Sequence, residues 1–484
     1  MKVKGNKREK LAKVLVRVVA IECVVLIAVV LVILGVKNKE RLFGKNDEKE
    51  TNVSNSTEIK EDGDILEASG TKVDASITEP TEEDKKLSEE ELLKKAEEEQ
   101  KAAKRKLLQE EANLLALGYD YDAAIEKLKA CEDYATDEEL QKLTAEYEEA
   151  KSKLVPFGAF QTADEISHVF FHSLIVDTSK AFDGDHMSNG YNYWMTTTSE
   201  FKLMLEQMYE RGYVLVSIHD IAKEGQLEDG SIGMVKGDLL LPPDKKPFVL
   251  SQDDTNFYDY MRTDGFATRI VIDEDGYPAC EIELDGKTVV DRDYDVVPIL
   301  EKFIEEHPDF SYRGARGIIG VTGYEGVIGY RTNDPTSPTY EQDVKQAKEV
   351  AERLKEIGWE FASHSYGHGH MGQKSANYVK EDSERWAKEC ASIIGETDIY
   401  LYPYGEDIQE GIGDYKGEKY DILYNSGFRY YCGVYAHPWI QIKGKYVRMT
   451  RRNLDGYTMH FYPERLEDLF DVAKTIDPAR PEFK

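Results

Sequence analysis

Short apolar strands and amphipathic helices alternate from residue 169 to residue 434 of this 484-residue chain. Hydrophobic periodicity predicts strands at 169–175, 213–220, 248–251, 317–322, 399–402 and 428–434, and helices at 199–212, 296–306, 340–357 and 375–394. Such alternation predicts a parallel sheet or barrel, because each parallel strand pair needs a crossover connection. Between 266 and 292, alternating residues around two Asp-Gly pairs predict an inserted β-hairpin.

Three of the expected strands end in polar residues suited to chemistry. The strand 248–251 runs into Asp253 and Asp254, and an apolar strand from Trp359 runs into a Gly-broken loop, 364–370, that carries three histidines. The strand 399–402 ends in the turn 403–405, which reads Pro-Tyr-Gly. Active sites of parallel α/β barrels are built at this carboxyl edge. The sequence therefore predicts that the three segments meet.

The histidine spacing suggests a metal site. His364 and His368 are four residues apart, so both imidazoles can turn toward one point. One carboxylate and two imidazoles leave coordination positions open for water and substrate, which is typical of a hydrolytic site. A second carboxylate can then act as a general base. Taken singly, the Asp pair also fits a capped turn, and each loop histidine also fits a surface residue.

In this order and context, Asp-Asp, His-Ser-x-x-His and Pro-Tyr-Gly resemble the motifs of the NodB-type polysaccharide deacetylases (carbohydrate esterase family 4), over roughly residues 157–470. The resemblance implies a deformed parallel (β/α) barrel that removes N-acetyl groups from an amino-sugar polysaccharide with a divalent metal ion, Zn²⁺ being preferred. It implies Asp253 as the base and Asp254, His364 and His368 as metal ligands. His370 remains an alternative to His368. The backbone N–H of Tyr404 is expected to help hold the oxyanion.

The chain departs from the family pattern at two motifs. Leu401 stands where the third motif carries a base-orienting Arg, and Arg451 and Arg452 are the candidates to replace it. The C-terminal Leu-x-His acid is not evident. A membrane- and surface-associated branch of the family opens its domain with a His-bearing strand, so the resemblance nominates His172 as the general acid. We also expect two aromatic residues to line a substrate groove: Tyr402 and Trp439.

The N-terminal third predicts an anchor, a tether and a stalk. Residues 1–17 are basic and 18–36 are almost wholly apolar, which predicts a transmembrane signal anchor with a cytoplasmic N-terminus. A cleaved signal peptide is the alternative. Residues 37–84 predict a disordered acidic tether. Helical spacing over 85–155 predicts an α-helical stalk or hairpin domain, of coiled-coil character, that acts as a spacer or a protein-docking surface. The deacetylase-like domain is expected at 157–474.

Composition limits the partners. A net charge of −31 argues against a nucleic-acid partner, because phosphate binding needs a basic surface. Five scattered cysteines without Cys-x-x-Cys spacing predict buried free thiols.

We therefore expect a single-pass cell-membrane protein with an extracytoplasmic deacetylase that acts on peptidoglycan or an exported polysaccharide. A glycan-binding barrel without turnover is one alternative. An O-acetyl carbohydrate esterase on the same site is the other.

Overall fold

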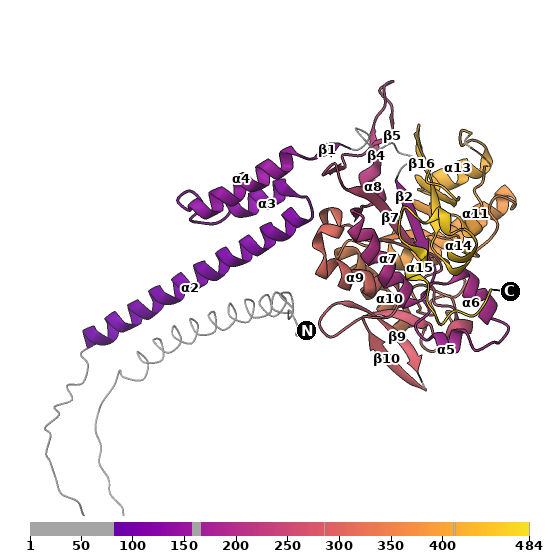
Figure 1. Cartoon of the computed structure of the whole chain (residues 1–484), viewed down its shortest axis with the longest axis horizontal. Helices are drawn as coiled ribbons and strands as arrows, with labels where there is room; N and C mark the ends of the chain where they lie inside the picture. Colours follow the sequence, from indigo (N-terminus) through magenta and orange to yellow (C-terminus); the bar gives the residue numbers. More distant parts are fainter. Residues whose placement is uncertain (1–81, 157–165, 285, 410, 412, 484) are drawn as a thin grey trace, which may run out of the picture. The chain divides into compact units, whose positions relative to one another are not determined.

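The computed structural model describes residues 82–156 and 166–483, except 285, 410 and 412 (Figure 1). The basic segment 1–17, the expected membrane anchor 18–36 and the tether up to residue 81 lie outside the described residues. Within the described part of the chain, no helix has both the length and the apolar character needed to cross a bilayer.

Three helices precede the barrel: α2 (Glu82–Leu117), α3 (Tyr121–Lys129) and α4 (Glu138–Ser152). Side chains of Asp120 and Asp137 accept backbone N–H groups and cap α3 and α4, as expected for acidic residues at these positions. Ala112, Ala116, Ala124, Leu128 and Leu140 are among the residues of a small shared core. These helices occupy the segment in which the sequence predicts helical structure.

Seven parallel strands form a closed ring. Their order is β7 (Lys246–Gln252), β11 (Ile318–Val321), β12 (Glu360–Ser363), β13 (Ile399–Leu401), β14 (Tyr430–Val434), β16 (Tyr446–Asn453) and β2 (Ser167–Phe171), which returns to β7. The ring is irregular, because β12 and β13 share one residue pair whereas β14 and β16 share five. This architecture is a deformed parallel barrel, as the family resemblance implies.

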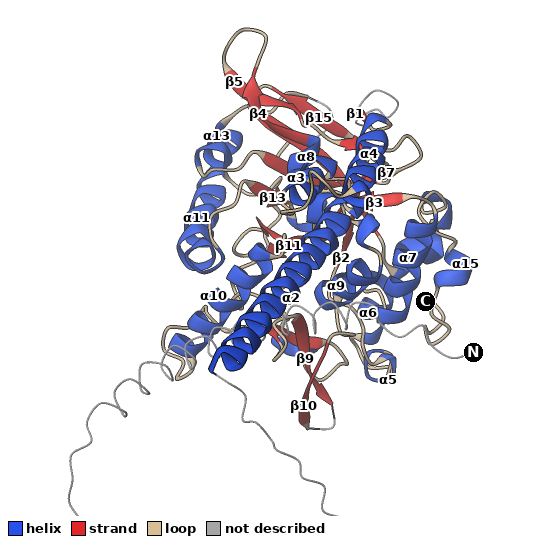
Figure 2. Ribbon diagram, turned by 90° about the vertical axis from the view of Figure 1, so that its left-hand side faces the viewer, coloured by secondary structure: helices blue, strands red, loops and turns tan. Residues whose placement is uncertain are grey.

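Helices surround the barrel (Figure 2). The helices of this part of the chain are α5 (Thr178–Ala181), α6 (Ser188–Trp194), α7 (Thr198–Glu210), α8 (Ile218–Ile221), α9 (Val296–Glu306), α10 (Tyr340–Glu356), α11 (Ala376–Trp386), α12 (Ser392–Ile394), α13 (Glu418–Asn425), α14 (Gly456–Phe461) and α15 (Val472–Thr475). A π-helical turn, Ala387–Ala391, joins α11 to α12.

Strand residues alternate between two separate cores. One core contains Val249, Ile318, Ala362, Leu401, Cys432 and Met449. The neighbouring residues Leu250, Ile319, Phe361, Tyr400 and Tyr431 pack in a second core with residues of α7, α9, α10, α11 and α13. Because successive side chains of a strand point to opposite faces, the first set faces the barrel interior and the second set faces the helices. This alternation fixes which polar residues can reach the barrel mouth.

Smaller strands decorate the barrel. β3 (Tyr213–Leu215) pairs with the start of β7, β15 (Ile440–Lys443) pairs antiparallel with β16, and β1 (Val155–Pro156) pairs with β6 (Leu240–Leu241). The predicted insertion at 266–292 is confirmed, but it has three antiparallel strands: β8 (Ala267–Ile272), β9 (Pro278–Leu284) and β10 (Lys287–Asp291). A second hairpin, β4 (Ala222–Gln226) and β5 (Ile232–Lys236), lies at the opposite end from β9 and β10 in both views (Figures 1 and 2).

The predicted strand 213–220 is too long. It ends at Leu215, and Ser217 then caps the short helix α8. The four cysteines that the structure describes are all buried and form no disulfide, as the sequence predicts: Cys131, Cys280, Cys390 and Cys432.

Candidate active site

The carboxyl ends of five parallel strands deliver the candidate residues to one edge of the barrel. Parallel strands in register bring their ends to the same side, which is where α/β barrels place their chemistry. The residues and the strands that they follow or end are His172 (β2), Asp253 and Asp254 (β7), His364 and His368 (β12), Tyr404 (β13) and Arg451 (β16). Predicted site residues more than 270 positions apart in sequence thus belong to one edge.

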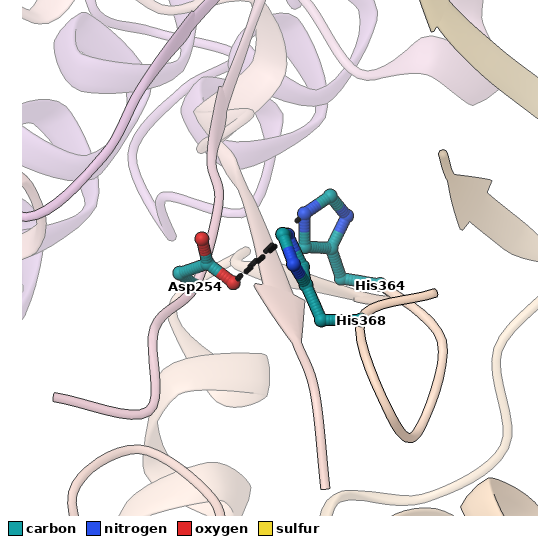
Figure 3. Close-up of side chains that lie close together, drawn as sticks. All are labelled: Asp254, His364 and His368. Carbon is teal, nitrogen blue, oxygen red and sulfur yellow. Dashed lines mark ion pairs between the residues drawn. The ribbon is translucent and has the colours of Figure 1, made fainter. Parts of the chain in front are cut away.

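Asp254, His364 and His368 converge (Figure 3). The Oδ1 atom of Asp254 lies 3.6 Å from Nε2 of His368 and 3.9 Å from Nε2 of His364. Ligand atoms of the three residues all lie within 4.8 Å of one another. Figure 3 shows the carboxylate facing both imidazoles across a small gap. This is the geometry of a three-residue metal site.

The donor set fits a divalent cation. Nitrogen and oxygen ligands at about 2.0–2.2 Å from a tetrahedral ion lie about 3.3–3.6 Å from each other, close to the distances observed. Nδ1 of His364 lies 2.8 Å from the carbonyl oxygen of Leu401, so this nitrogen donates its proton and Nε2 keeps a lone pair for the metal. Burial lowers the pKa of His368 to about 4, against the opposing charge of Asp254, so this imidazole is neutral at neutral pH. A ligand must be in that form.

His370 is not part of this group. Its ring stacks on Tyr404 at 3.9 Å between centroids, and its Nδ1 atom lies 3.1 Å from a carboxylate oxygen of Glu406. Among the described residues, the His that joins Asp254 and His364 is therefore His368, as the sequence motif predicts.

Asp253 has a buried cationic partner. Nη1 of Arg451 donates to its Oδ1 atom at 2.5 Å, and both side chains are almost completely buried. Burial alone would raise the pKa of Asp253, but Arg451 and the imidazoles of His364 and His172 outweigh it and hold the pKa well below its ordinary range. Asp253 is therefore a carboxylate at neutral pH, held by an arginine of β16, which is separated from β7 in the ring only by β2.

The second arginine candidate lies elsewhere. Arg452 points away from Asp253 and donates to the carboxylate of Asp468 and the hydroxyl of Ser167. Neighbouring residues of a strand face opposite sides, so only one of the pair can reach the barrel interior. The expectation that Arg452 orients Asp253 is wrong.

One of the two aromatic residues expected to line a substrate groove, Tyr402, lies away from the barrel mouth. Tyr402 is fully buried on the helix-facing side of its strand and its hydroxyl lies 3.2 Å from that of Tyr415. That prediction fails because Tyr402 faces the helix layer rather than the barrel mouth. Trp439 is half-buried and its ring lies against the guanidinium of Arg448, which pairs with Asp407.

Tyr404 does reach the surface. Its ring is 58% exposed and lies 4.5 Å from the ring of His368. The Pro403–Gly405 turn follows β13 as expected. The edge therefore carries an exposed aromatic ring beside one candidate metal ligand.

Strained backbone marks the same edge. Asp254, Ser365, His368 and Tyr404 have φ values of 53°, 55°, 47° and 57°. These left-handed conformations are uncommon for residues other than glycine. Strain of this kind persists where surrounding structure holds it, and it concentrates at functional sites.

Two residues that support the site were not predicted. The hydroxyl of Tyr258 donates to Oδ1 of Asp254 at 2.6 Å. Asp382 of α11 accepts the backbone N–H groups of Tyr366 and Gly367, and so holds the histidine loop. Proximity to Asp254 in sequence is a weak signal for Tyr258. No sequence signal marks Asp382, because it lies on a helix beyond the loop.

This chain forms a closed parallel barrel, and its carboxylate and imidazole side chains gather at the carboxyl edge. That architecture is typical of (β/α)-barrel enzymes. Residues 336–419, which contain α10, the histidine loop, α11 and the Pro-Tyr-Gly turn, match the family model named polysaccharide deacetylase. The match covers 84 of the 484 residues, so this segment of the chain is similar to polysaccharide deacetylases.

Three solved structures are similar to this chain. A deacetylase of Streptococcus pyogenes, PplD in complex with acetate, has 15% identity and a TM-score of 0.31, covering 65% of this chain and 98% of its own. A de-N-acetylase of Aggregatibacter actinomycetemcomitans has 13% identity and a TM-score of 0.35, covering 63% and 99%. A polysaccharide deacetylase of Bacillus cereus has 11% identity and a TM-score of 0.33, covering 63% and 69%. No curated protein gives a match.

Proposed function

We propose that this protein is a metal-dependent hydrolase that removes N-acetyl groups from an amino-sugar polysaccharide at the cell surface. The observation that carries the proposal is the convergence of Asp254, His364 and His368 beside the buried Asp253–Arg451 pair. A metal-binding triad next to an ionised, well-oriented carboxylate is the arrangement that hydrolysis of an amide needs.

Asp254, His364 and His368 would hold the divalent cation. Their mixed oxygen and nitrogen donors suit Zn²⁺. When bound, such an ion supplies Lewis acidity and makes water more acidic.

The other residues move protons and orient groups. Asp253 takes a proton from the attacking water as this water adds to the acetyl carbonyl carbon, and Arg451 fixes the carboxylate in place. The backbone N–H of Tyr404 faces the charge that develops on the carbonyl oxygen. His172 gives a proton to the amide nitrogen as the carbon–nitrogen bond breaks. The products are acetate and the free amine of the sugar.

The cellular location is proposed from the sequence alone. Residues 18–36 would anchor the chain in the membrane, 37–84 would form a tether and 85–155 a spacer or docking stalk. The catalytic domain, 157–474, would then act outside the cytoplasm on peptidoglycan or an exported polysaccharide.

A substrate panel tests the proposal. The full chain, purified in detergent and supplied with Zn²⁺, is expected to release acetate from N-acetylglucosamine oligomers faster than from O-acetylated xylan oligomers. Release from the O-acetylated substrate alone would make the protein an esterase. Binding of both oligomers without release of acetate from either would indicate a glycan-binding barrel.

A further inference from the structure

Three tyrosines form a continuous stack beside Asp254. Tyr258 and Tyr260 lie in the loop after β7, and Tyr324 lies in the loop after β11. The ring of Tyr258 lies 5.8 Å from that of Tyr260 and 5.2 Å from that of Tyr324, with interplanar angles of 12° and 17°. Near-parallel rings at these separations are offset-stacked.

The middle ring of the stack already has its contacts. Tyr258 is buried, and its hydroxyl lies within hydrogen-bonding distance of both Asp254 and Thr322. The outer rings differ, because Tyr260 is 52% exposed and Tyr324 is 39% exposed. Two large aromatic surfaces are therefore exposed to solvent, and Tyr258 connects both of them to the candidate metal ligand Asp254.

The two loops that carry the stack are tied to each other. The side chain of Asn256 accepts the backbone N–H of Thr322 and donates to its carbonyl oxygen. The guanidinium of Arg331 donates to the carbonyl oxygens of Asn256, Phe257 and Glu325. Both loops are thus held before a ligand arrives, and a prearranged surface loses less entropy on binding.

The charge of Asp254 acts on Tyr260, which agrees with the position of Tyr260 beside the candidate metal site. Burial, followed by the charges of Asp254 and Glu325, raises the pKa of Tyr260 to about 12. The phenol is therefore uncharged at neutral pH, and the ring presents an apolar face with one hydroxyl at its edge.

We propose that Tyr260 and Tyr324 form a binding subsite for an uncharged pyranose ring of the polysaccharide, next to the sugar that is deacetylated. This inference rests on the proposed function. A pyranose has an apolar face of C–H groups and a rim of hydroxyls, which matches an exposed tyrosine ring. Because the stack meets the metal triad through Tyr258 and Asp254, the bound ring belongs to the same polymer as the reacting sugar.

The subsite predicts a dependence on chain length. A single N-acetylglucosamine fills only the reacting position, whereas a tetramer also covers the tyrosines. In the full chain carrying Asp253→Asn, which prevents turnover, the double change Tyr260→Ala/Tyr324→Ala is expected to weaken binding of the N-acetylglucosamine tetramer at least tenfold by calorimetry. Tyr260→Phe/Tyr324→Phe keeps both rings and is expected to bind within about threefold of the parent.

Trp194→Ala is the matched control. Trp194 is an exposed aromatic residue of α6 whose ring lies against Tyr193 and Tyr457 and not against the three stacked tyrosines. It is expected to bind the tetramer like the parent. The subsite would be overturned if the double Ala variant bound the tetramer as tightly as the parent. It would also be overturned if Trp194→Ala lost as much tetramer affinity as the double Ala variant.

Kinetics separate this inference from the proposed function. In the catalytically intact chain, the double Ala change is expected to raise KM for the tetramer about tenfold and to reduce the preference for tetramer over monomer. If the intact chain released no acetate but the double Ala change still weakened tetramer binding, the subsite would stand and the deacetylase assignment would fall. If the intact chain released acetate but the double Ala change left tetramer binding unchanged, the deacetylase assignment would stand and the subsite would fall.

Discussion

Arg451 provides, from β16, the guanidinium that the family's third motif usually carries beside its Pro-Tyr-Gly turn. Leu401 occupies the motif position, and its side chain packs inside the barrel while its carbonyl oxygen orients His364. The ion pair with Asp253 is thus preserved although its arginine comes from another strand. Arg451 thus compensates for Leu401 at the motif position, because its side chain also faces the barrel interior.

Arg451→Met is expected to destabilise the protein by about 3–5 kcal/mol, because it leaves the Asp253 carboxylate buried without a partner. Chemical denaturation of the full chain in detergent, followed by tryptophan fluorescence, measures the loss. Adding Asp253→Asn should restore much of it, since the unpaired charge is then gone. Arg262→Met, which breaks an exposed pair with Glu283, should cost about 0–1 kcal/mol. Similar losses for Arg451→Met and Arg262→Met would contradict the account.

Tyr258→Phe is expected to weaken Zn²⁺ binding about 10–100-fold, because the hydroxyl that orients the Asp254 carboxylate is removed while the ring remains. Competition with a chromophoric chelator gives the affinity. Tyr324→Phe removes a hydroxyl from the same stack without touching Asp254, and it should bind Zn²⁺ like the parent. Unchanged affinity in Tyr258→Phe would show that Asp254 is held by other contacts.

At the scale of elements, the histidine loop depends on α11. Asp382 lies on that helix and accepts the N–H groups of Tyr366 and Gly367, between the two candidate ligands of the loop. Asp382→Ala is expected to lower Zn²⁺ affinity about tenfold through looser ligand positioning, although no ligand is lost. Asp382→Asn keeps one oxygen acceptor and should lose less. Circular dichroism at the same temperature checks that both variants remain folded, and equal affinities in the parent and Asp382→Ala would refute the role.

A second element-scale feature lies at the amino-terminal end of the barrel strands. His219 of α8 pairs through Nδ1 with Glu360 at the start of β12 and through Nε2, at 3.0 Å, with Asp398 before β13. Burial opposes protonation of His219, but the hydrogen bonds that its ring donates to the carboxylates of Asp398 and Glu360 outweigh burial and raise its pKa to about 10. A protonated imidazole therefore joins three elements.

This raised pKa predicts how stability changes with pH. The contribution of His219 is complete below its ordinary pKa of about 6.5 and is lost as pH rises toward 10. Because the side chain is 38% exposed, solvent screening limits the contribution to about 1–2 kcal/mol. The stability difference between the parent and His219→Gln, measured by denaturation from pH 6 to 10, should shrink as pH rises. A difference that stays constant over this range would exclude the charged clamp.

Periodicity predicted most elements, and the errors have physical causes. Apolar alternation identified six of the seven ring strands but missed β16, whose pattern is interrupted by three arginines. The strand expected to run to Asp220 stops early because Ser217 and Asp220 form a capping box. The β4–β5 hairpin was missed because its sequence is polar and glycine-rich, with only Ala222, Gly233 and Met234 buried.

At the scale of the whole molecule, the sequence predicted the reacting groups better than their neighbours. Histidine spacing pointed to His364 and His368, and the family resemblance added Asp254; the three side chains converge in the structure. The sequence does not show whether Arg451 or Arg452 reaches Asp253. Closure of the barrel decides this, because it determines which face of β16 is interior. Long-range partners such as Tyr258 and Tyr324 depend on two loops meeting, which periodicity does not report.

Acetate release by the full chain, with and without a chelator, tests whether this protein is a metal-dependent deacetylase. We expect Zn²⁺-dependent release from N-acetylglucosamine oligomers by the parent, loss of release with the chelator, and recovery when Zn²⁺ is restored. Asp254→Ala should bind Zn²⁺ weakly and release almost no acetate. Release that persists in the chelated parent, or in Asp254→Ala, would contradict a hydrolase built on the Asp254–His364–His368 site.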